Sequence, residues 1–282
     1  MDLEILHYTA FSTDPRGGNP AGVVPDAARL DEAAMQAIAR RLNYSETAFL
    51  TELSAGAYRV RYFSPEAEVP FCGHATIASA VALADRTGPG AFRFETAAGR
   101  VDVETGRDEA GGYAVLTSVA PQVDIPTGDL VDRALAALRW SADDLDPALP
   151  PRVAFAGARH LVLATTSRAR LARLDYDFDG LRALMLTHDL TTVALVHRES
   201  PGRYHVRNPF PVGGVVEDPA TGAAAAAFGA YLRALGEVEP PAEVTLLQGE
   251  DMGRPSRLLV RITPRPGIEV RGHAVPMTIT AT

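Results

Sequence analysis

Two short segments in the first half of the chain carry residue types that can move protons. Glu46 stands in the segment 43–47, beside side chains that can donate hydrogen bonds to its carboxylate. Cys72 and His74 flank Gly73 just before an expected helix. Imidazole is the side chain best suited to proton transfer near neutral pH. These residues therefore indicate acid–base chemistry, although an isolated glutamate is more often a solvated surface group.

A further candidate acid, Asp218, stands before Pro219 at the start of an alanine-rich segment. Aspartate followed by proline is typical of a helix N-cap and first helical position, so a structural role is one interpretation. The functional interpretation depends on an internal repeat, which predicts that Asp218 lies across a cleft from His74.

The lysine content excludes several catalytic classes. All 27 basic residues are arginine, so a Schiff-base lysine and the lysine of a phosphate-binding Walker loop are both impossible. Dinucleotide-binding, serine-hydrolase and zinc-binding motifs are missing from the sequence as well. Cys72-Gly73-His74 lacks a further thiolate or a second nearby histidine, which makes it a poor metal site. We therefore expect neither a metal nor an organic cofactor.

Composition and charge restrict the partners. The 282 residues are 46% hydrophobic and carry a formal net charge of −8, with no long uncharged apolar run. We expect a folded cytoplasmic protein that binds neither membrane nor nucleic acid. The acidic N-terminal segment lacks the basic start of a signal peptide, and one cysteine cannot form an internal disulfide. A small molecule is the expected partner.

The second half of the chain repeats the first. The segment 58–65 is echoed by 204–211, and an Ala-Thr pair follows at nearly the same distance in each copy. Both pairs are expected to open alanine-rich helices, over 76–85 and 221–235. Chance similarity is the alternative, but a duplicated α/β half with a pseudo-two-fold axis explains more. Such a duplication would bring two helix N-termini toward one cleft and favour an anionic ligand there.

Other elements follow from periodicity and turn signals. A helix is expected over 31–42 with Asp31 as N-cap. Pro121 and Pro126 mark the boundary between two half-domains, 1–120 and 121–282, with the last strand returning to the first half. The counterpart of Glu46 falls near Thr191, which is neither acid nor base, so the cleft would hold one base from this position. Strands are expected over 5–11, 21–25, 47–51, 58–63, 92–96, 100–104, 113–119 and 192–196.

Five motifs in order along the chain together resemble the PhzF-like phenazine-biosynthesis family. The resemblance implies the diaminopimelate-epimerase-like fold. In this α/β fold, two pseudo-symmetric halves each wrap a mainly antiparallel sheet round a central helix. The motifs occupy residues 18–21, 43–47, 71–76, 217–222 and 248–256.

The resemblance also implies an activity. In the family's characterised isomerase, a carboxylate matching Glu46 moves a proton within trans-2,3-dihydro-3-hydroxyanthranilate without metal or organic cofactor, and residues matching His74 and Asp218 surround the substrate. We accordingly expect a homodimer with catalytic Glu46, His74 and Asp218. Substrate-binding residues would be Gly18, Asn19, Gly73, Ala75, Thr76, Thr221 and Gly222.

Departures from related sequences leave three functions open. Related epimerases use two cysteines as acid and base, and this chain has only Cys72, which excludes two-thiol racemisation. Ala223 stands where many relatives have serine, which makes the native substrate uncertain. The leading hypothesis is a proton-shuttling isomerase of a small carboxylate-bearing ring or amino acid. The alternatives are a one-base epimerase that uses Cys72 or Glu46, and a small-molecule or partner-binding protein without turnover.

Overall fold

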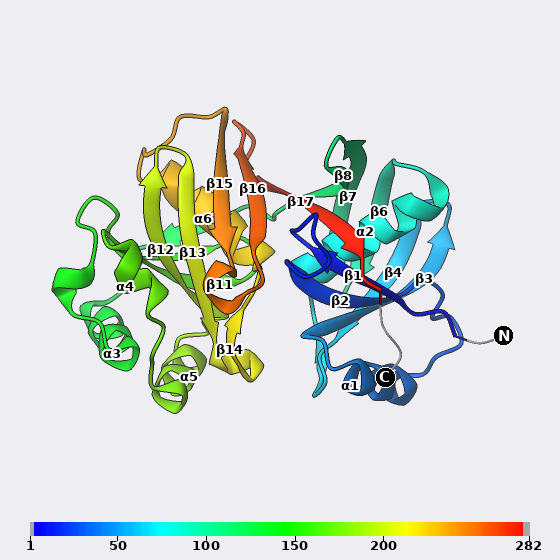
Figure 1. The fold of residues 1–282 in the computed structure, drawn as a ribbon, viewed down its shortest axis with the longest axis horizontal. Helices are drawn as coiled ribbons and strands as arrows, with labels where there is room; N and C mark the ends of the chain where they lie inside the picture. Colours follow the sequence, from blue (N-terminus) through cyan, green and yellow to red (C-terminus); the bar gives the residue numbers. More distant parts are fainter. Residues whose placement is uncertain (1–2, 279–282) are drawn as a thin grey trace. The chain divides into compact units, whose positions relative to one another are not determined.

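A computed structural model describes residues 3–278, and the chain divides into two compact units. The first unit runs to Thr117 and takes up the chain again from Arg271, and the second spans Ser118–Val270. Both units combine strands with a few helices (Figure 1). Within residues 3–278, no helix is long and apolar enough to cross a membrane.

The first unit is a mainly antiparallel sheet with two helical crossovers. Helices α1 and α2 lie in the parallel connections β2–β3 and β4–β6, whereas the neighbouring pairs β1–β2, β3–β4, β6–β7 and β7–β8 are antiparallel. The elements are β1 (Leu6–Ala10), β2 (Asn19–Val24), α1 (Glu32–Leu42), β3 (Glu46–Ser54), β4 (Ala57–Phe63), β5 (Glu68–Val69), α2 (Gly73–Thr87), β6 (Ala91–Thr96), β7 (Gly99–Asp108) and β8 (Gly111–Thr117).

The second unit repeats this order with a larger outer layer. Helix α3 precedes β10, α4 and α5 lie in the parallel β11–β12 connection, and α6 lies in the parallel β13–β15 connection. Its elements are β9 (Gln122–Asp124), α3 (Gly128–Leu138), β10 (Arg152–Phe155), β11 (Arg159–Thr165), α4 (Arg168–Ala172), α5 (Phe178–Thr187), β12 (Thr192–Ser200), β13 (Arg203–Phe210), β14 (Val215–Asp218), α6 (Gly222–Ala234), β15 (Ala242–Gln248) and β16 (Ser256–Ile262). The last strand, β17 (Ile268–Pro276), begins in this unit and ends beside β1 in the first.

Strand register confirms the internal repeat. Tyr58 pairs with Glu52 and Tyr204 pairs with Arg198, and each hairpin then has an irregularity before its turn. Glu46 and Thr192 are the first residues of the corresponding strands β3 and β12. The counterpart of Glu46 is therefore Thr192, one residue beyond the predicted position.

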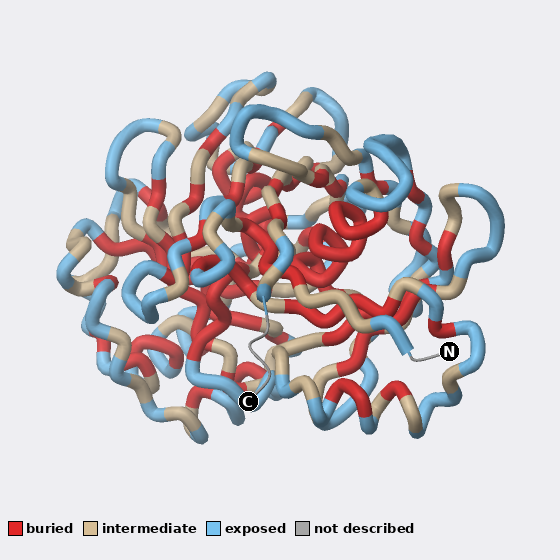
Figure 2. Tube along the Cα trace, turned by 45° about the vertical axis from the view of Figure 1, so that its right-hand side comes forward, coloured by how far each residue is buried: buried red, intermediate tan, exposed pale blue. Residues whose placement is uncertain are grey.

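Each unit wraps its sheet round one buried helix. Every residue of α2 from Gly73 to Leu83 is buried, and α6 is almost as completely enclosed (Figure 2). Alanine dominates both helices because small side chains let strands approach from several sides. At Gly229 in α6, even a Cβ atom would lie 2.6 Å from Val260 Cγ1. This arrangement is the diaminopimelate-epimerase-like α/β fold that the motifs imply.

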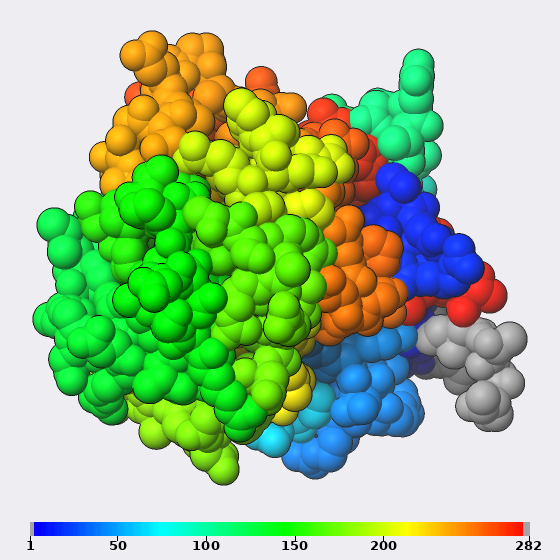
Figure 3. Space-filling model, turned by 60° about the vertical axis from the view of Figure 1, so that its left-hand side comes forward, coloured from blue at the N-terminus to red at the C-terminus, as the bar shows by residue number. Residues whose placement is uncertain are grey.

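Amphipathic helices cover the outer faces of the sheets. In the first unit, α1 packs Met35 and Ile38 against Phe49 and Phe63. Asp31 caps this helix as predicted, accepting a hydrogen bond from Ala34 N at 2.8 Å. In the second unit, α3 and α5 bury leucines against β11 and β12, and the segment that carries α3, α4 and α5 forms the green surface in Figure 3.

Candidate active site

The start of α2 differs from its predicted position. The helix begins at Gly73 with Cys72 as N-cap, so His74 lies inside the first turn and not before the helix. Cys72 makes no side-chain capping bond, which explains why the sequence did not reveal this start. Both donors of Thr76 are used within the helix start, because its N–H and its hydroxyl donate to Cys72 O, at 3.0 and 2.7 Å.

Glu46 and His74 come together in the first unit. Glu46 Oε2 lies 3.4 Å from His74 Nε2, and the two side chains are 12% and 5% exposed. Ser45 Oγ lies 3.2 Å from the same nitrogen. On the other side of the ring, Asn19 Nδ2 lies 3.1 Å from His74 Nδ1. With the amide in this orientation, Nδ1 accepts and the ring proton is at Nε2, facing the Glu46 carboxylate.

Burial keeps the imidazole neutral. Desolvation lowers the pKa of His74 below its ordinary value of 6.5, and this effect exceeds the opposing attraction of the Glu46 carboxylate. A neutral imidazole lies beside the carboxylate without protonating it. Glu46 can therefore accept a proton from a carbon or nitrogen acid placed beside it.

The tight turn before β2 aims Asn19 at His74. Gly18 has φ 67°, and a Cβ atom there would lie 2.3 Å from Ala10 O, so only glycine fits. Thr9 Oγ1 donates to Gly17 O at 2.6 Å and fixes the same turn. Sequence reasoning expected Gly18 and Asn19 to bind substrate, and it missed that Asn19 positions the histidine.

The side chain of Cys72 contacts the same histidine ring. Its Sγ atom is 3.3 Å from His74 Nδ1 and 3.7 Å from Nε2. One donor atom from each of Glu46, Cys72 and His74 lies within 4.8 Å of the others. The parallel β2–β3 pairing and the early start of α2 create this cluster, and no local sequence signal shows it.

Asp218 does not cap α6, contrary to the prediction from Asp-Pro. It is the last residue of β14, where it pairs with Asn208, and the N-cap of α6 is Thr221. Pairing in the sheet holds the Asp218 backbone extended. Pro219 and Ala220 then connect β14 to the N-cap residue of α6. Thr221 Oγ1 donates to Asp218 Oδ2 at 2.5 Å.

Gln248, at the end of β15, stabilises the segment between β14 and α6. Its Oε1 accepts from Thr221 N at 3.1 Å, and its Nε2 donates to Asp218 O at 2.7 Å. The following Gly249 has φ 76° and lies against Arg254 O and Pro219 O, where no larger side chain fits. The segment 249–255 thus forms the connection between the antiparallel strands β15 and β16.

An arginine–glutamate pair recurs on the short strand before each central helix. In the first unit, Arg61 contacts Glu68 at 2.7 and 2.6 Å. In the second, Arg207 contacts Glu217 at 2.9 and 2.5 Å, and these side chains are 9% and 4% exposed. Each pair ties a return strand, β5 or β14, to the preceding strand and thereby fixes where the chain enters the helix.

At the position in the second unit that corresponds to Glu46, the structure has a series of hydrogen bonds between buried side chains. His160 Nδ1 lies 2.7 Å from Thr192 Oγ1, which donates to Asn208 Oδ1 at 2.9 Å. All three side chains are buried, and burial lowers the pKa of His160 to about 3. This hydrogen-bonded network is neutral and contains no ionised base.

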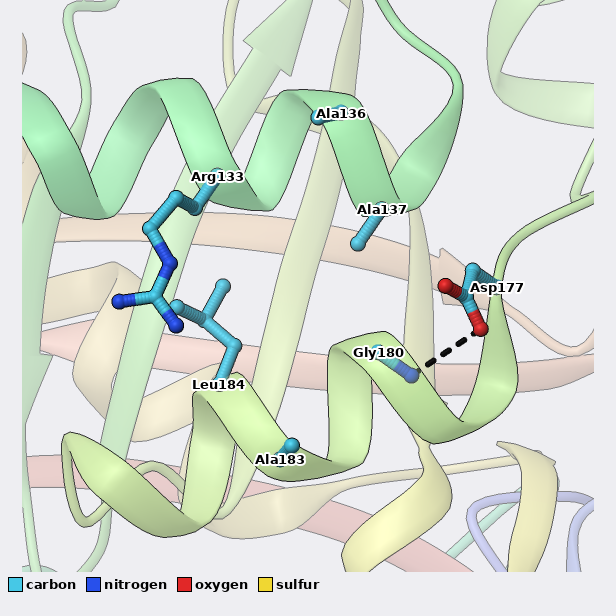
Figure 4. A pocket seen from close by; sticks show the side chains of 7 residues that line it. All are labelled: Arg133, Ala136, Ala137, Asp177, Gly180, Ala183 and Leu184. Atoms are coloured by element: carbon cyan, nitrogen blue, oxygen red, sulfur yellow. Dashed lines mark hydrogen bonds between the residues drawn. The ribbon is translucent and has the colours of Figure 1, made fainter.

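A hollow of about 420 Å³ lies elsewhere in the second unit, between α3 and α5 (Figure 4). Asp177 is used to cap α5 by accepting from Gly180 N, and Arg133 lies 3.6 Å from Asp129. The remaining lining is apolar: Ala136, Ala137, Ala183 and Leu184. The hollow therefore lacks the acid–base residues of the Glu46 cluster.

The duplicated sheet–helix fold and a carboxylate beside a neutral histidine define a class of isomerases with the diaminopimelate-epimerase-like fold. Residues 8–279 match the family described as phenazine biosynthesis-like protein. The chain belongs to this family, and it is an isomerase.

Individual relatives agree with this assignment. The chain is 34% identical to trans-2,3-dihydro-3-hydroxyanthranilate isomerase of Pseudomonas chlororaphis, over 95% of this chain and 96% of that protein. The crystal structure of a predicted epimerase from Pseudomonas aeruginosa matches with a TM-score of 0.88 at 30% identity, covering 98% of each chain. A probable proline racemase from Agrobacterium radiobacter, at 13% identity and TM-score 0.70 over 100% of this chain and 93% of that one, shares the fold.

Proposed function

We propose that the protein is a cofactor-independent isomerase that moves one proton within a small carboxylate-bearing substrate. The observation that carries the proposal is Glu46 Oε2 at 3.4 Å from the neutral, buried His74. Glu46 takes the proton from one atom of the substrate and returns it to another. His74 lies beside the carboxylate and, being neutral, does not protonate it.

The substrate carboxylate is proposed to bind at the start of α2. The first N–H groups of a helix have no partner within it and attract anions. Gly73 and Ala75 supply such groups, whereas the Thr76 N–H is already bonded to Cys72 O. Gly18 and Asn19 would complete this part of the site.

Asp218, Thr221 and Gly222 at the start of α6 are proposed to contribute to the same reaction. Asp218 would bind a polar group of the substrate, oriented by the Thr221 hydroxyl. The expectations of a cytoplasmic location and of a homodimer stay predictions.

Substitution Asp218→Asn should raise KM and lower kcat/KM about 10- to 100-fold, because a hydrogen bond to a charged group contributes about 1.5–3 kcal/mol. The amide oxygen can still accept from Thr221, so the fold should persist. Steady-state kinetics measure the change, and Asp179→Asn, an exposed acid in the first turn of α5, is the control. Unchanged kinetics in Asp218→Asn would remove this residue from the site.

The substrate class follows from the relative in Pseudomonas chlororaphis, whose name gives a dihydro-hydroxyanthranilate. We propose a ring or amino acid of this kind, with a carboxylate and an acidic C–H. A one-base epimerase is the second candidate, because Cys72 Sγ lies 3.3 Å from His74 Nδ1 and could serve as the base instead.

Incubation in D2O with a panel of such substrates separates the candidates. For the isomerase, we expect NMR to show a shifted double bond, with the original stereocentres elsewhere in the molecule unchanged. Deuterium incorporation with inversion at one carbon would favour the epimerase. If neither change occurred across a panel that includes trans-2,3-dihydro-3-hydroxyanthranilate, the isomerase proposal would be contradicted.

A further inference from the structure

Phe11 has a backbone conformation that bulky residues rarely adopt. Its φ is 65°, in the left-handed region, and the residue is 1% exposed. Phe11 directly follows β1, and its N–H donates to His273 O of β17 at 2.7 Å. A strained conformation of this kind persists only where the surrounding structure enforces it, and such positions cluster at functional sites. The packing of the Phe11 ring must therefore supply a constraint.

Gly272 of β17 provides the space that the Phe11 ring occupies. A Cβ atom at residue 272 would lie within 2.6 Å of both Phe11 Cδ1 and Phe11 Cε1. The φ of Gly272 lies outside the left-handed region, so glycine is needed here for room and not for backbone conformation. Any larger residue at 272 would have to displace either the ring or the strand.

The residues on either side of Gly272 anchor the strand. Arg271 and His273 both contact Asp108 at the end of β7, with His273 Nε2 at 3.0 Å from Asp108 Oδ1. The Arg271 guanidinium also stacks on Tyr113, 3.6 Å from the ring centroid. Successive residues of a strand point to opposite faces, so these contacts hold the other face of Gly272 against the phenyl ring. A side chain at 272 would therefore displace the phenyl ring and not β17.

Phe11 begins the turn that leads to Asn19. Ala10 and Asn19 pair across the β1–β2 hairpin, so the course of the turn between them depends on the direction in which Phe11 leaves β1. At the other end of the turn, a Cβ atom at Gly18 would lie 2.9 Å from Ser12 Cβ. The two ends of the turn are thus in close contact, and a displacement of Phe11 would be transmitted to Asn19.

We propose that Phe11 and Gly272 are positioning residues of the active site, which hold Asn19 against His74. Asn19 Nδ2 lies 3.1 Å from His74 Nδ1, and His74 Nε2 lies 3.4 Å from Glu46 Oε2. A displaced Asn19 releases one edge of the imidazole ring, and the Glu46 carboxylate then loses a fixed neighbour. The effect on turnover rests on the proposed function, whereas the effect on the histidine does not.

A double-mutant cycle tests whether Gly272 acts through Asn19. Gly272→Ala should lower kcat about tenfold, because small displacements of groups around the reacting atoms reduce rates strongly. In an Asn19→Ala background, the same substitution should change kcat less than about twofold, since the contact through which it acts is already lost. Equal factors in the two backgrounds would overturn the proposal.

The matched control is Gly229→Ala in α6. Its Cβ atom would lie 2.6 Å from Val260 Cγ1, a clash of similar severity in the core of the second unit. This variant should also lower the melting temperature, but any change in kcat should be the same with and without Asn19. Circular dichroism verifies folding. Phe11→Leu removes the ring without adding an atom at Gly272, and it should show the same dependence on Asn19 even where Gly272→Ala does not fold.

Nitrogen-15 NMR of the histidine rings gives a readout that is independent of turnover. The chain has seven histidines, and the signals lost in His74→Asn assign the ring of interest. In Gly272→Ala, the Nδ1 resonance of His74 should move in the same direction as in Asn19→Ala, because both variants weaken the hydrogen bond to that nitrogen. An unchanged resonance in the folded variant would refute the positioning role. A shifted resonance in a protein whose native form turns over no substrate of the panel would instead refute the isomerase proposal and leave the positioning role standing.

Discussion

Replacing Glu46 by glutamine should lower turnover at least about 100-fold, the usual contribution of a positioned general base. Glutamine has nearly the same shape, and Asn19 and Ser45 still contact His74, so the ring should stay in place. It cannot accept a proton at neutral pH. We therefore expect an unchanged melting temperature and an almost unchanged KM, measured by thermal unfolding and steady-state kinetics.

The matched control is Cys72→Ala, which removes the other candidate base. If Glu46 is the base, this variant should keep activity within a few-fold and lose about 1 kcal/mol of stability through the small cavity. The opposite pattern, a folded but inactive Cys72→Ala with an active Glu46→Gln, would make Cys72 the base and favour the one-base epimerase.

Glu217→Gln should destabilise the protein by about 3 kcal/mol, because it removes the bidentate partner of the buried Arg207 guanidinium. Arg207 then keeps only the more distant carboxylate of Asp251, at 3.9 Å, and the carbonyl of Ala172. The pair is bidentate and almost fully shielded from water. Urea denaturation measures the loss. Since the pair ties β14 to β13, we also expect impaired use of Asp218, seen as a raised KM where the variant remains folded.

The repeat supplies the control for this prediction. Glu68→Gln removes the corresponding carboxylate from Arg61, but that pair is about one-third exposed, at 29% and 31%. Exposed ion pairs contribute about 0–1 kcal/mol, and Arg61 also retains Glu32 at 2.8 Å. Equal losses in the two variants would show that burial does not set the energy of the Arg207–Glu217 pair.

Local patterns in the sequence predicted much of the fold. Apolar residues recurring every three to four positions and the Asp31 cap located the helix before β3, and the echo of 58–65 in 204–211 predicted the duplicated halves. These features depend on neighbours within a few residues, or on similarity between two segments, and both can be read without coordinates.

Other features depend on competition between local preference and tertiary packing. The Asp218-Pro219 pair favours an N-cap, but pairing of Asp218 with Asn208 outweighs that preference. The early start of α2 likewise follows from burial of Gly73 and His74, which have low helix propensity. The contact of Glu46 with His74 and Cys72 joins segments that only the sheet brings together, so no motif could give its distances.

Thr192 limits how the second half of this protein can evolve. Its hydroxyl is bonded on one side to His160 and on the other to Asn208, and all three side chains are buried. A carboxylate in its place would have to ionise without solvent, which burial opposes. A second proton carrier at this position would therefore require changes in the surrounding network as well as at Thr192 itself.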